Sequence, residues 1–600
     1  MRFLSTLAAS VLGTLIAVGA LILFLFLFIF AISLSADSTP QVQPGTILTL
    51  DVQGPIPERV SDDPLTRQLS DQPDYDASDV ISALSKAEND SRISGVWIRL
   101  KGSQASWATL EEIRAAITDF RESGKPVIAS SGDFGMLEKD YFLASAADSI
   151  FAGPVTAFEF NGFYLPQTFF KGTLDKLGVE PKVVRAGQYK SAVETFTRND
   201  LSDNNEEQLQ ALVETQYDVF LSAIAESRSI DMSQLRDIAT SNAPMDAGPA
   251  RDLGMIDDIR YTDQVVDVLR GILGLEDGGD VPIIDVADYS RVPASEVGIE
   301  TTGDGRVAVI YGSGQIVPGD AEGGPFGSTG MMASDPLIEA FEDARENESI
   351  KAVVFRIDSP GGSAAASEAI WRAVERTKAV KPVIVSMGSL AASGGYYVAA
   401  PADSIVATPS TITGSIGVFG LLFNVEGLLT EKLGVGIDDV RTSDLADIYS
   451  PFSDFSEQER TLLASSIDRT YDTFLQRVAE GRNMSVDEVD AIAQGRVWSG
   501  RDAKDVGLVD VLGGLSDAVR IAGEKAGLGD GPYAVQTLPR QKTFFERLNE
   551  DLSGQAAHLY FNRTATDLER KMQEKRALIQ YYLSQSGKVQ ARLPVDLSVQ

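Results

Sequence analysis

The chain has 600 residues, of which 44% are hydrophobic and 23% are charged, and its formal net charge at pH 7 is −34. A chain of this length exceeds what one ordinary core supports, so we expect two or more domains. The negative charge disfavours nucleic acid, whose phosphates the chain would repel, and adhesion to an anionic membrane surface. We therefore expect no nucleic-acid partner.

Two absences narrow the chemistry further. The sequence contains no cysteine, which excludes thiol nucleophiles, disulfides and sulfur-ligated metals. It contains one histidine, His558, so a Ser-His-Asp triad or a multi-histidine metal site is hard to build. We therefore expect no metal ion and no cofactor, and a hydrolytic nucleophile needs a base other than histidine.

An apolar run opens the chain, from about residue 7 to residue 34, and includes the stretch LILFLFLFIFAI. A signal-peptide core takes about 7–15 apolar residues, whereas a bilayer span takes about 20. The run is long enough to span, so it predicts a retained transmembrane helix over residues 1–36, in contact with the lipid bilayer. Cleavage near Ser35-Ala36 is the alternative.

The charges that flank this run favour one orientation. Arg2 precedes it, and Asp37 and Asp51 follow it, which places the N-terminus inside the cell and the bulk of the chain outside. In a bacterium the protein would then lie in the inner, cytoplasmic membrane with its bulk in the periplasm. The absence of cysteine is compatible with that compartment.

The chain contains an internal duplication with an offset of about 255 residues. The matching segments are ENDSRISGVWIRLKG and ENESIKAVVFRIDSPGG, GKPVIAS and VKPVIVS, YFLASAADSI and YYVAAPADSI, and LDKLGV and TEKLGV. A constant offset across four segments indicates one duplicated domain, not a short repeat array. We predict a first repeat over residues 45–285, a second over 300–535, and a charged helical extension over 536–600.

Each repeat alternates strands with helices. KAVVFRID and KPVIVS are β-rich runs, ASEAIWRAVERTK has helical spacing, and SGGYYVAAPAD follows as a short helix. A long amphipathic helix follows in both repeats, with Ser202 and Ser456 where N-caps would lie. The alternation predicts an α/β fold with parallel sheets.

Ser393 is the candidate nucleophile. It follows a strand-and-turn segment of small residues and precedes Gly394 and Gly395 at a helix start. Small neighbours let a substrate backbone approach, and helix N-terminal N–H groups favour a developing oxyanion. The alternative is that AASGG is a tight turn and nothing more.

The segment DSPGGS follows the strand KAVVFRI. Its Gly361 and Gly362 have no side chain, so their backbone N–H groups can be accessible where a side chain would block them. Together with the amide of Gly394, they could form an oxyanion hole with two donors. The alternative is an ordinary strand-to-helix turn.

Aligning the repeats separates the candidate residues. Glu138 stands opposite Ser393, KGSQAS stands opposite DSPGGS, and Lys190 stands opposite Ala446. One repeat keeps the serine and the other keeps the lysine, which predicts a site assembled between the repeats. Lys190 must be neutral to act as a base, and burial can lower its pKa from about 10.4 toward neutrality.

Four motifs in order, GQYKSAVETFTRNDLS, DSPGGS, AASGGYY and TPSTITGSIGVFG, resemble the long, internally duplicated form of bacterial signal peptide peptidase A. The resemblance covers the chain from the apolar run to about residue 535. It implies tandem domains of the Clp-protease and crotonase type. It also implies a homotetrameric dome that acts on apolar peptides, the remnants of cleaved signal peptides.

The resemblance also implies roles for individual residues. Ser393 matches the family's nucleophile, and Lys190 matches its general base. Ser415 matches a serine that orients the lysine, and Gly362 and Gly394 match the oxyanion-hole positions. The family is one of serine proteases with a serine–lysine dyad.

Two other classes remain open. An acyl-CoA enzyme of the crotonase type shares the oxyanion-hole architecture, but it would not require Ser393 and Lys190. A non-catalytic membrane scaffold would tolerate replacement of both residues without loss of any activity.

Overall fold

A computed structural model describes residues 40–61, 73–132, 135–241, 245–301, 303–320, 330–529, 531–541, 546 and 590–592, with residues 12–14, 16–17, 19–20 and 24 near the N-terminus. No helix within these ranges is long and apolar enough to cross a membrane. Most of the predicted transmembrane segment over residues 1–36 lies outside the described residues.

The first repeat is built on a parallel sheet with the strand order β8-β4-β3-β2-β1-β9. Its strands are β1 (Thr46–Gly54), β2 (Ile93–Ser103), β3 (Val127–Ser130), β4 (Ser149–Ala152), β8 (Asp258–Ile259) and β9 (Ile283–Asp285). Alternate side chains of each strand point to opposite faces. One face packs on α3 (Ala77–Asn89), α4 (Trp107–Glu122) and α5 (Glu138–Ala144), and the other on α11 (Thr262–Leu273).

The second repeat has the same plan on a larger sheet, with the main strand order β19-β17-β15-β13-β10-β21. Its strands are β10 (Arg306–Ser313), β13 (Ile350–Ser359), β15 (Val383–Ala392), β16 (Ser404–Ala407), β17 (Ile412–Gly414), β19 (Val497–Ser499), β20 (Val511–Leu512) and β21 (Ala534–Leu538). The helices α13 (Ser334–Glu346), α14 (Ala364–Lys378) and α15 (Gly394–Ala399) cover one face, and α19 (Leu515–Lys525) covers the other. The predicted alternation of strands and helices is confirmed in both repeats.

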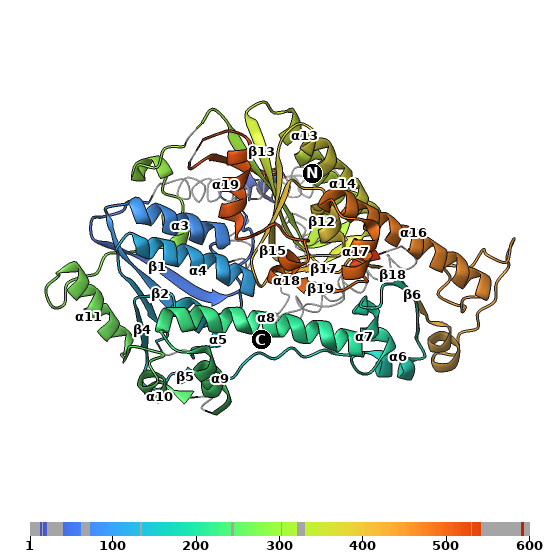
Figure 1. The fold of residues 1–600 in the computed structure, drawn as a ribbon, viewed down its shortest axis with the longest axis horizontal. Coiled ribbons are helices and arrows are strands. Elements are labelled where there is room, and N and C mark those ends of the chain that lie inside the picture. The colour runs from blue at the N-terminus through green and yellow to red at the C-terminus, as the bar shows by residue number, and fades with distance from the viewer. Residues whose placement is uncertain are drawn as a thin grey trace, which may run out of the picture.

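A third sheet joins the two repeats, with the order β12-β11-β14-β22-β18-β6. Its strands are β6 (Glu180–Ala186), β11 (Gln315–Val317), β12 (Met331–Ala333), β14 (Gly361–Ser363), β18 (Val418–Asn424) and β22 (Gln590–Arg592). β6 belongs to the first repeat and pairs antiparallel with β18 of the second along its whole length. This pairing carries a strand of the first repeat into the territory of the second (Figure 1).

Of the extension predicted to be helical over residues 536–600, the structure describes residues 536–541, 546 and 590–592, and two of these segments contain strand. β21 runs on to Leu538, and residues 590–592 form β22. Both segments pair with strands of the second repeat, which supply the hydrogen bonds that a helix would have made internally. Most of the remaining extension lies outside the described residues.

Two long helices occupy corresponding places in the repeats. α8 (Asp203–Arg228) and α16 (Glu457–Arg482) each have 26 residues. The predicted N-caps are confirmed, because the side chains of Ser202 and Ser456 accept hydrogen bonds from the third residue of each helix. α8 runs from the sheet of the first repeat to β19 of the second (Figure 1), where Leu209 and Leu212 pack against Ile412 and Val497.

A buried charge cluster also connects the repeats. Arg356 on β13 binds Glu58 through Nε at 2.7 Å and Glu112 on α4 through Nη2 at 2.6 Å. Its Nη1 donates to the Ser386 hydroxyl at 2.8 Å. A buried arginine needs such partners, because an unpaired charge in the interior is strongly unfavourable.

The shorter elements of the described chain link these layers. They are β5 (Ala157–Phe158), α6 (Lys171–Leu177), η1 (Ser191–Val193), α7 (Glu194–Thr197), α9 (Met232–Ser241), β7 (Met245–Asp246), α10 (Ala247–Asp252), α12 (Val286–Tyr289), η2 (Ala294–Val297), η3 (Leu428–Lys432), α17 (Val486–Ile492) and α18 (Gly500–Asp505). The first of these helical turns after β6, η1, begins directly after Lys190.

Candidate active site

Ser393 lies in a sharp turn between β15 and α15. Its backbone has φ 57° and ψ −116°, outside the regions that a residue with a Cβ ordinarily adopts. Its N–H donates to the Gly414 carbonyl at 2.8 Å, and its carbonyl accepts from Tyr397 N in α15 at 2.9 Å. These two bonds hold the strained turn, and the side chain it presents is fully buried.

Glycines surround this turn because neighbouring backbone comes very close. A Cβ added at Gly395 would lie 2.8 Å from the Ser359 carbonyl oxygen, and one added at Gly362 would lie 2.1 Å from the Ile316 carbonyl oxygen. Gly362 is part of β14, and Gly394 is the first residue of α15. The structure thus places both predicted oxyanion-hole glycines in the segments that adjoin Ser393.

Lys190 reaches Ser393 from the other repeat. Its Nζ lies 2.8 Å from the Ser393 Oγ, 2.9 Å from the Ser415 Oγ and 2.9 Å from the Ser415 carbonyl oxygen. The Lys190 side chain is 1% exposed. Lys190 therefore lies within hydrogen-bond distance of Ser393, the predicted nucleophile, and of Ser415, the serine to which the resemblance assigned orientation of the lysine.

The environment of Lys190 favours its neutral form. Burial lowers the pKa of the Lys190 ammonium well below its ordinary value, because the charged form loses its hydration. A neutral amine has two N–H donors and one lone pair. The Ser415 carbonyl can only accept, so it takes one N–H, and the lone pair is available for the Ser393 hydroxyl proton.

Ser415 is itself held in an unusual conformation. It has φ 50° and follows Gly414, which has φ 73° at the end of β17. Its N–H donates to the Arg496 carbonyl at 2.7 Å. The turn directs both the hydroxyl and the carbonyl of Ser415 at one nitrogen, which fixes the position of the lysine head group.

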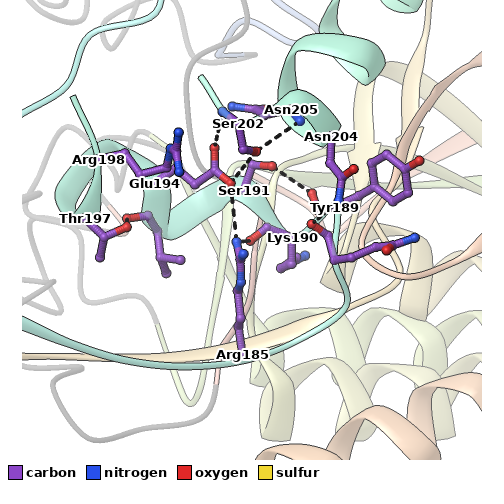
Figure 2. A network of polar contacts seen from close by, with 12 residues as sticks. Arg185, Tyr189, Lys190, Ser191, Glu194, Thr197, Arg198, Ser202, Asn204 and Asn205 are labelled. Carbon is purple, nitrogen blue, oxygen red and sulfur yellow. Dashed lines mark hydrogen bonds and ion pairs between the residues drawn. The ribbon is translucent and has the colours of Figure 1, made fainter. Parts of the chain in front are cut away.

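A network of polar contacts holds the loop that contains Lys190, here called the lysine loop, in position (Figure 2). Arg185 on β6 donates from Nη1 to the Lys190 carbonyl at 3.2 Å and to the Glu194 Oε1 at 3.4 Å. The buried Glu194 carboxylate also accepts the Ser202 hydroxyl at 2.7 Å. These hydrogen bonds connect the end of β6 to the turn after Lys190 and to the N-cap of α8.

Gln208 on α8 fastens the same loop to the second repeat. Its Nε2 donates to the Tyr189 carbonyl at 3.2 Å and to the Ser191 Oγ at 3.1 Å, on either side of Lys190. Its Oε1 accepts from Val497 N on β19 at 3.1 Å. A Cβ added at Gly495 would lie 2.6 Å from Lys190 N, so the loops of the two repeats touch backbone to backbone.

Reasoning from the sequence missed these supporting residues. Gln208 and Glu194 lie on helices whose polar positions gave no signal of a buried role. Arg356 carried a signal, because it is a lone charge inside the apolar strand KAVVFRI and so required a buried partner. Asp358 belongs to the DSPGGS motif, and its carboxylate accepts from Leu390 N at 2.9 Å and from the Ser389 hydroxyl at 2.5 Å. It ties the oxyanion-hole segment to the strand that leads to Ser393.

No cluster of histidine, cysteine, aspartate and glutamate able to hold a metal ion occurs in the part of the chain that the structure describes. A buried serine in contact with a buried lysine, beside two glycine amides, is an arrangement suited to acyl transfer. The fold and the site together define the class of serine proteases. The chain belongs to peptidase family S49, which matches residues 119–276 and 375–529, one match in each repeat.

The relatives of this chain bear related names. It is 33% identical over 496 residues to the chloroplastic serine protease SPPA of Arabidopsis thaliana, covering 81% of this chain and 70% of the relative. It is 36% identical over 500 residues to protease 4 of Salmonella typhi, covering 80% and 78%. It is 34% identical over 454 residues to protease 4 of Haemophilus influenzae, covering 74% and 72%. The predicted resemblance to signal peptide peptidase A is confirmed.

Solved structures that resemble the chain include a ClpP1 variant from Listeria monocytogenes, with a TM-score of 0.23 and 16% identity over 36% of this chain and 94% of that one. A likeness of this size carries no argument. The tandem S49 repeats are shown, and the Clp-protease and crotonase type of fold stays a prediction.

Proposed function

We propose that the protein is a membrane-anchored serine endopeptidase in which Ser393 and Lys190 form the catalytic dyad and which degrades apolar peptides, including the remnants of cleaved signal peptides. The observation that carries the proposal is the contact of 2.8 Å between Lys190 Nζ and Ser393 Oγ inside a buried site. The described contacts of the Lys190 head group are with two serines, and a buried lysine with such partners is suited to proton transfer.

The first step is attack on the peptide carbonyl. Neutral Lys190 takes the hydroxyl proton of Ser393 while the Oγ forms a bond to the carbonyl carbon. The carbonyl oxygen becomes an oxyanion, and the amides of Gly362 and Gly394 donate hydrogen bonds to it. Because these donors are fixed by close backbone packing, they need no rearrangement as charge develops.

The tetrahedral intermediate then collapses to an acyl-enzyme. The bond between carbon and nitrogen breaks, and the Lys190 ammonium gives its proton to the leaving amine. The neutral lysine next takes a proton from water, whose oxygen attacks the acyl carbon. Ser393 recovers its proton from Lys190 as the acid product leaves. Ser415 keeps the lysine head group in place throughout, through its hydroxyl and its carbonyl.

The setting of this chemistry is also part of the proposal. The apolar run over residues 7–34 supports an anchor in the inner membrane with the catalytic part in the periplasm. The resemblance to signal peptide peptidase A implies apolar remnants of cleaved signal peptides as substrates, and a relative in Enterococcus faecium bears the name of a signal peptide peptidase. No cofactor is needed for the steps above.

We also propose a homotetramer. In the first repeat the segment after LDKLGV forms β6, which pairs with β18. In the second repeat Leu433 and Val435, within TEKLGV, and Val440, shortly after it, have exposed apolar side chains. Assembly with other copies would cover these side chains, and light scattering of the detergent-solubilised protein measures the number of copies.

The test of the proposed function is hydrolysis of an apolar peptide with a fluorogenic leaving group. Wild type is compared with Ser393→Ala, Lys190→Ala and the control Lys86→Met, which removes a buried lysine of the same repeat whose Nζ binds the Ser290 and Val292 carbonyls. We expect both site variants to lose more than about a thousandfold in kcat/KM, and Lys86→Met to keep turnover. Near-normal turnover by Lys190→Ala would contradict the assigned base.

A further inference from the structure

Ser359 is the last residue of β13, and it lies between the two segments that carry the oxyanion-hole glycines. Its side chain is fully buried. In one direction the chain continues through two residues to Gly362 in β14. From the other side α15, which begins at Gly394, packs directly against Ser359, because a Cβ added at Gly395 would lie 2.8 Å from the Ser359 carbonyl oxygen. Ser359 therefore stands where the two halves of the oxyanion hole meet.

The Ser359 hydroxyl makes two hydrogen bonds, one as acceptor and one as donor. It accepts from Gly361 N at 3.1 Å and donates to the Gly314 carbonyl at 2.7 Å. A serine hydroxyl has one proton and free lone pairs, so it makes both bonds at once. Gly314 lies in the turn between β10 and β11, and Ile316 of β11 pairs with Gly362. The hydroxyl thus joins the segment that precedes Gly362 to the strand beside it.

The bond from Gly361 decides which amide of this segment can face a developing oxyanion. Ser359 is followed by Pro360, which has no N–H. The next two amides belong to Gly361 and Gly362. Each amide has one proton to donate, and that of Gly361 is taken by the Ser359 hydroxyl. The oxyanion-hole role in this segment therefore falls to Gly362.

We propose that Ser359 is a positioning residue of the oxyanion hole, whose hydroxyl holds the peptide unit of Gly361 and so fixes the direction of the Gly362 amide. The proposal rests on the proposed function, because it assumes that the Gly362 amide binds the oxyanion. Peptide units are planar and share a Cα with the next unit, so fixing one restricts the next. The bond to the Gly314 carbonyl fixes the hydroxyl itself. A donor oriented in advance stabilises the oxyanion without rearrangement.

The first repeat shows that the fold does not need this hydroxyl. Its residue at the aligned position is Gly102, which has no side chain. The segment after Gly102 is held by the Asp140 carboxylate, which accepts from Ser103 N at 2.9 Å. The strand and the helix that follows it form without a serine in this place. We therefore expect Ser359→Ala to fold, so that its activity can be measured.

The experiment measures hydrolysis of a fluorogenic apolar peptide by wild type, Ser359→Ala and the control Thr377→Val, per active site titrated with a fluorophosphonate probe. Thr377→Val removes another fully buried hydroxyl, which donates to the Ala373 carbonyl of the same helix at 2.9 Å. We expect kcat of Ser359→Ala to fall about tenfold or more with KM within about twofold, because the oxyanion depends on a directed amide more than the ground-state carbonyl does. Thr377→Val should keep both constants. An unchanged kcat in Ser359→Ala would overturn the inference.

A peptide aldehyde separates positioning from stability. It adds to the Ser393 Oγ as a hemiacetal whose oxygen occupies the oxyanion position, so it reports on the oxyanion hole through binding alone. Its Ki should rise in Ser359→Ala by the factor by which kcat/KM falls. A loss of folded enzyme would lower the number of active sites and leave Ki unchanged. An unchanged Ki together with a lower kcat would show a structural role and overturn the inference.

A double variant tests whether Ser359 acts through Gly362. Gly362→Ala displaces the amide by itself, so adding Ser359→Ala should lower kcat by no more than about twofold further. Losses that multiply would show that Ser359 acts on another group, which overturns the inference.

The outcomes separate this inference from the proposed function. If wild type is active and Ser359→Ala equals it, the inference is overturned and the peptidase stands. If wild type hydrolyses no peptide and binds no aldehyde, the proposed function fails and the inference fails with it.

Discussion

Glu138 of the first repeat stands at the position that Ser393 occupies in the second repeat. The residues around these two positions also differ, because the first repeat has carboxylates where the second has the serine and a glycine. Glu138 begins a regular helix, and its carboxylate accepts from Asn161 N at 2.9 Å. Asp140 stands opposite Gly395, and its buried carboxylate accepts from Ser103 N at 2.9 Å, in the segment opposite DSPGGS. In the first repeat the Asp140 carboxylate therefore accepts a hydrogen bond from the backbone amide at the end of β2. In the second repeat the aligned residue is Gly395, which has no side chain to make such a bond.

The framework around these positions is the same in both repeats. Tyr141 donates its hydroxyl proton to the Met255 carbonyl at 2.8 Å, and Tyr396 donates to the Leu508 carbonyl at 2.9 Å. The corresponding buried strands are β3, with the sequence VIAS, and β15, which begins with VIVS, and each precedes a short helix, α5 or α15. The comparison teaches that the fold of the repeat does not require the chemistry, so each repeat is free to supply only part of one site.

The largest expected effect concerns the charge that joins the repeats. Arg356→Met leaves the buried Glu58 and Glu112 without their partner, and we expect a loss of about 3–5 kcal/mol in the free energy of unfolding. The aligned arginine of the first repeat, Arg99, is more exposed and pairs with Asp51, so Arg99→Met should cost about 1 kcal/mol or less. Urea unfolding followed by fluorescence measures both values. Equal losses would show that the buried cluster is not special.

The next effect concerns the oxyanion hole. Gly362→Ala places a Cβ 2.1 Å from the Ile316 carbonyl oxygen and displaces the amide, so we expect kcat to fall by about 10²–10³. The residue opposite it in KGSQAS is Ala105. Ala105→Gly should leave kcat within about twofold, because the first repeat contributes no donor to the oxyanion. A large loss of kcat in Ala105→Gly would contradict the division between repeats.

A third effect separates function from stability at the lysine. Because burial lowers the pKa of Lys190, the unfolded chain takes a proton there below about pH 10.5 while the folded chain stays neutral down to the lowered pKa. Lys190 thus destabilises the fold below pH 10.5, by about 1.4 kcal/mol for each unit of pKa lowering.

Lys190→Met removes this penalty. We expect a stability gain that grows as the pH falls from 10.5 toward the lowered pKa and is constant below it. Thermal unfolding across this pH range measures the gain. The matched change Ala446→Lys, at the aligned position of the second repeat, should leave stability unchanged within about 0.5 kcal/mol. A loss of stability in Lys190→Met at neutral pH would show that the lysine is a structural ion.

The smallest effect concerns backbone strain. Ser393 has φ 57°, so Ser393→Gly should be more stable than Ser393→Ala by about 1 kcal/mol. Glu138 lies in a helix, so Glu138→Gly should be less stable than Glu138→Ala by about 1 kcal/mol. Urea unfolding measures the difference in stability between the glycine and the alanine variant at each position. A difference of opposite sign at Ser393 and at Glu138 supports backbone strain at Ser393 and not at Glu138.

The sequence predicts the duplication, the alternation of strands and helices and the residues that meet at the site. The site residues can be predicted because the two repeats can be aligned with each other. Ser393 and Lys190 are then the positions at which one repeat has a reactive side chain and the other does not. The supporting contacts could not be predicted this way. Gln208 and Arg356 act through partners hundreds of residues away, and the pairing of Gln590 with Phe419 needs the third sheet, which the pattern of either repeat alone does not reveal.

The central claim is that one site is made from both repeats, with Ser393 as nucleophile and a neutral Lys190 as base. Stopped-flow acylation with an activated ester of an apolar peptide, followed by acid quench and peptide mapping, tests it most directly. We predict an acyl group on Ser393, a rate that falls as the pH drops through the lowered pKa of Lys190, and no measurable acylation in Lys190→Ala. An acyl group on another residue, or an unchanged rate in Lys190→Ala, would contradict the claim.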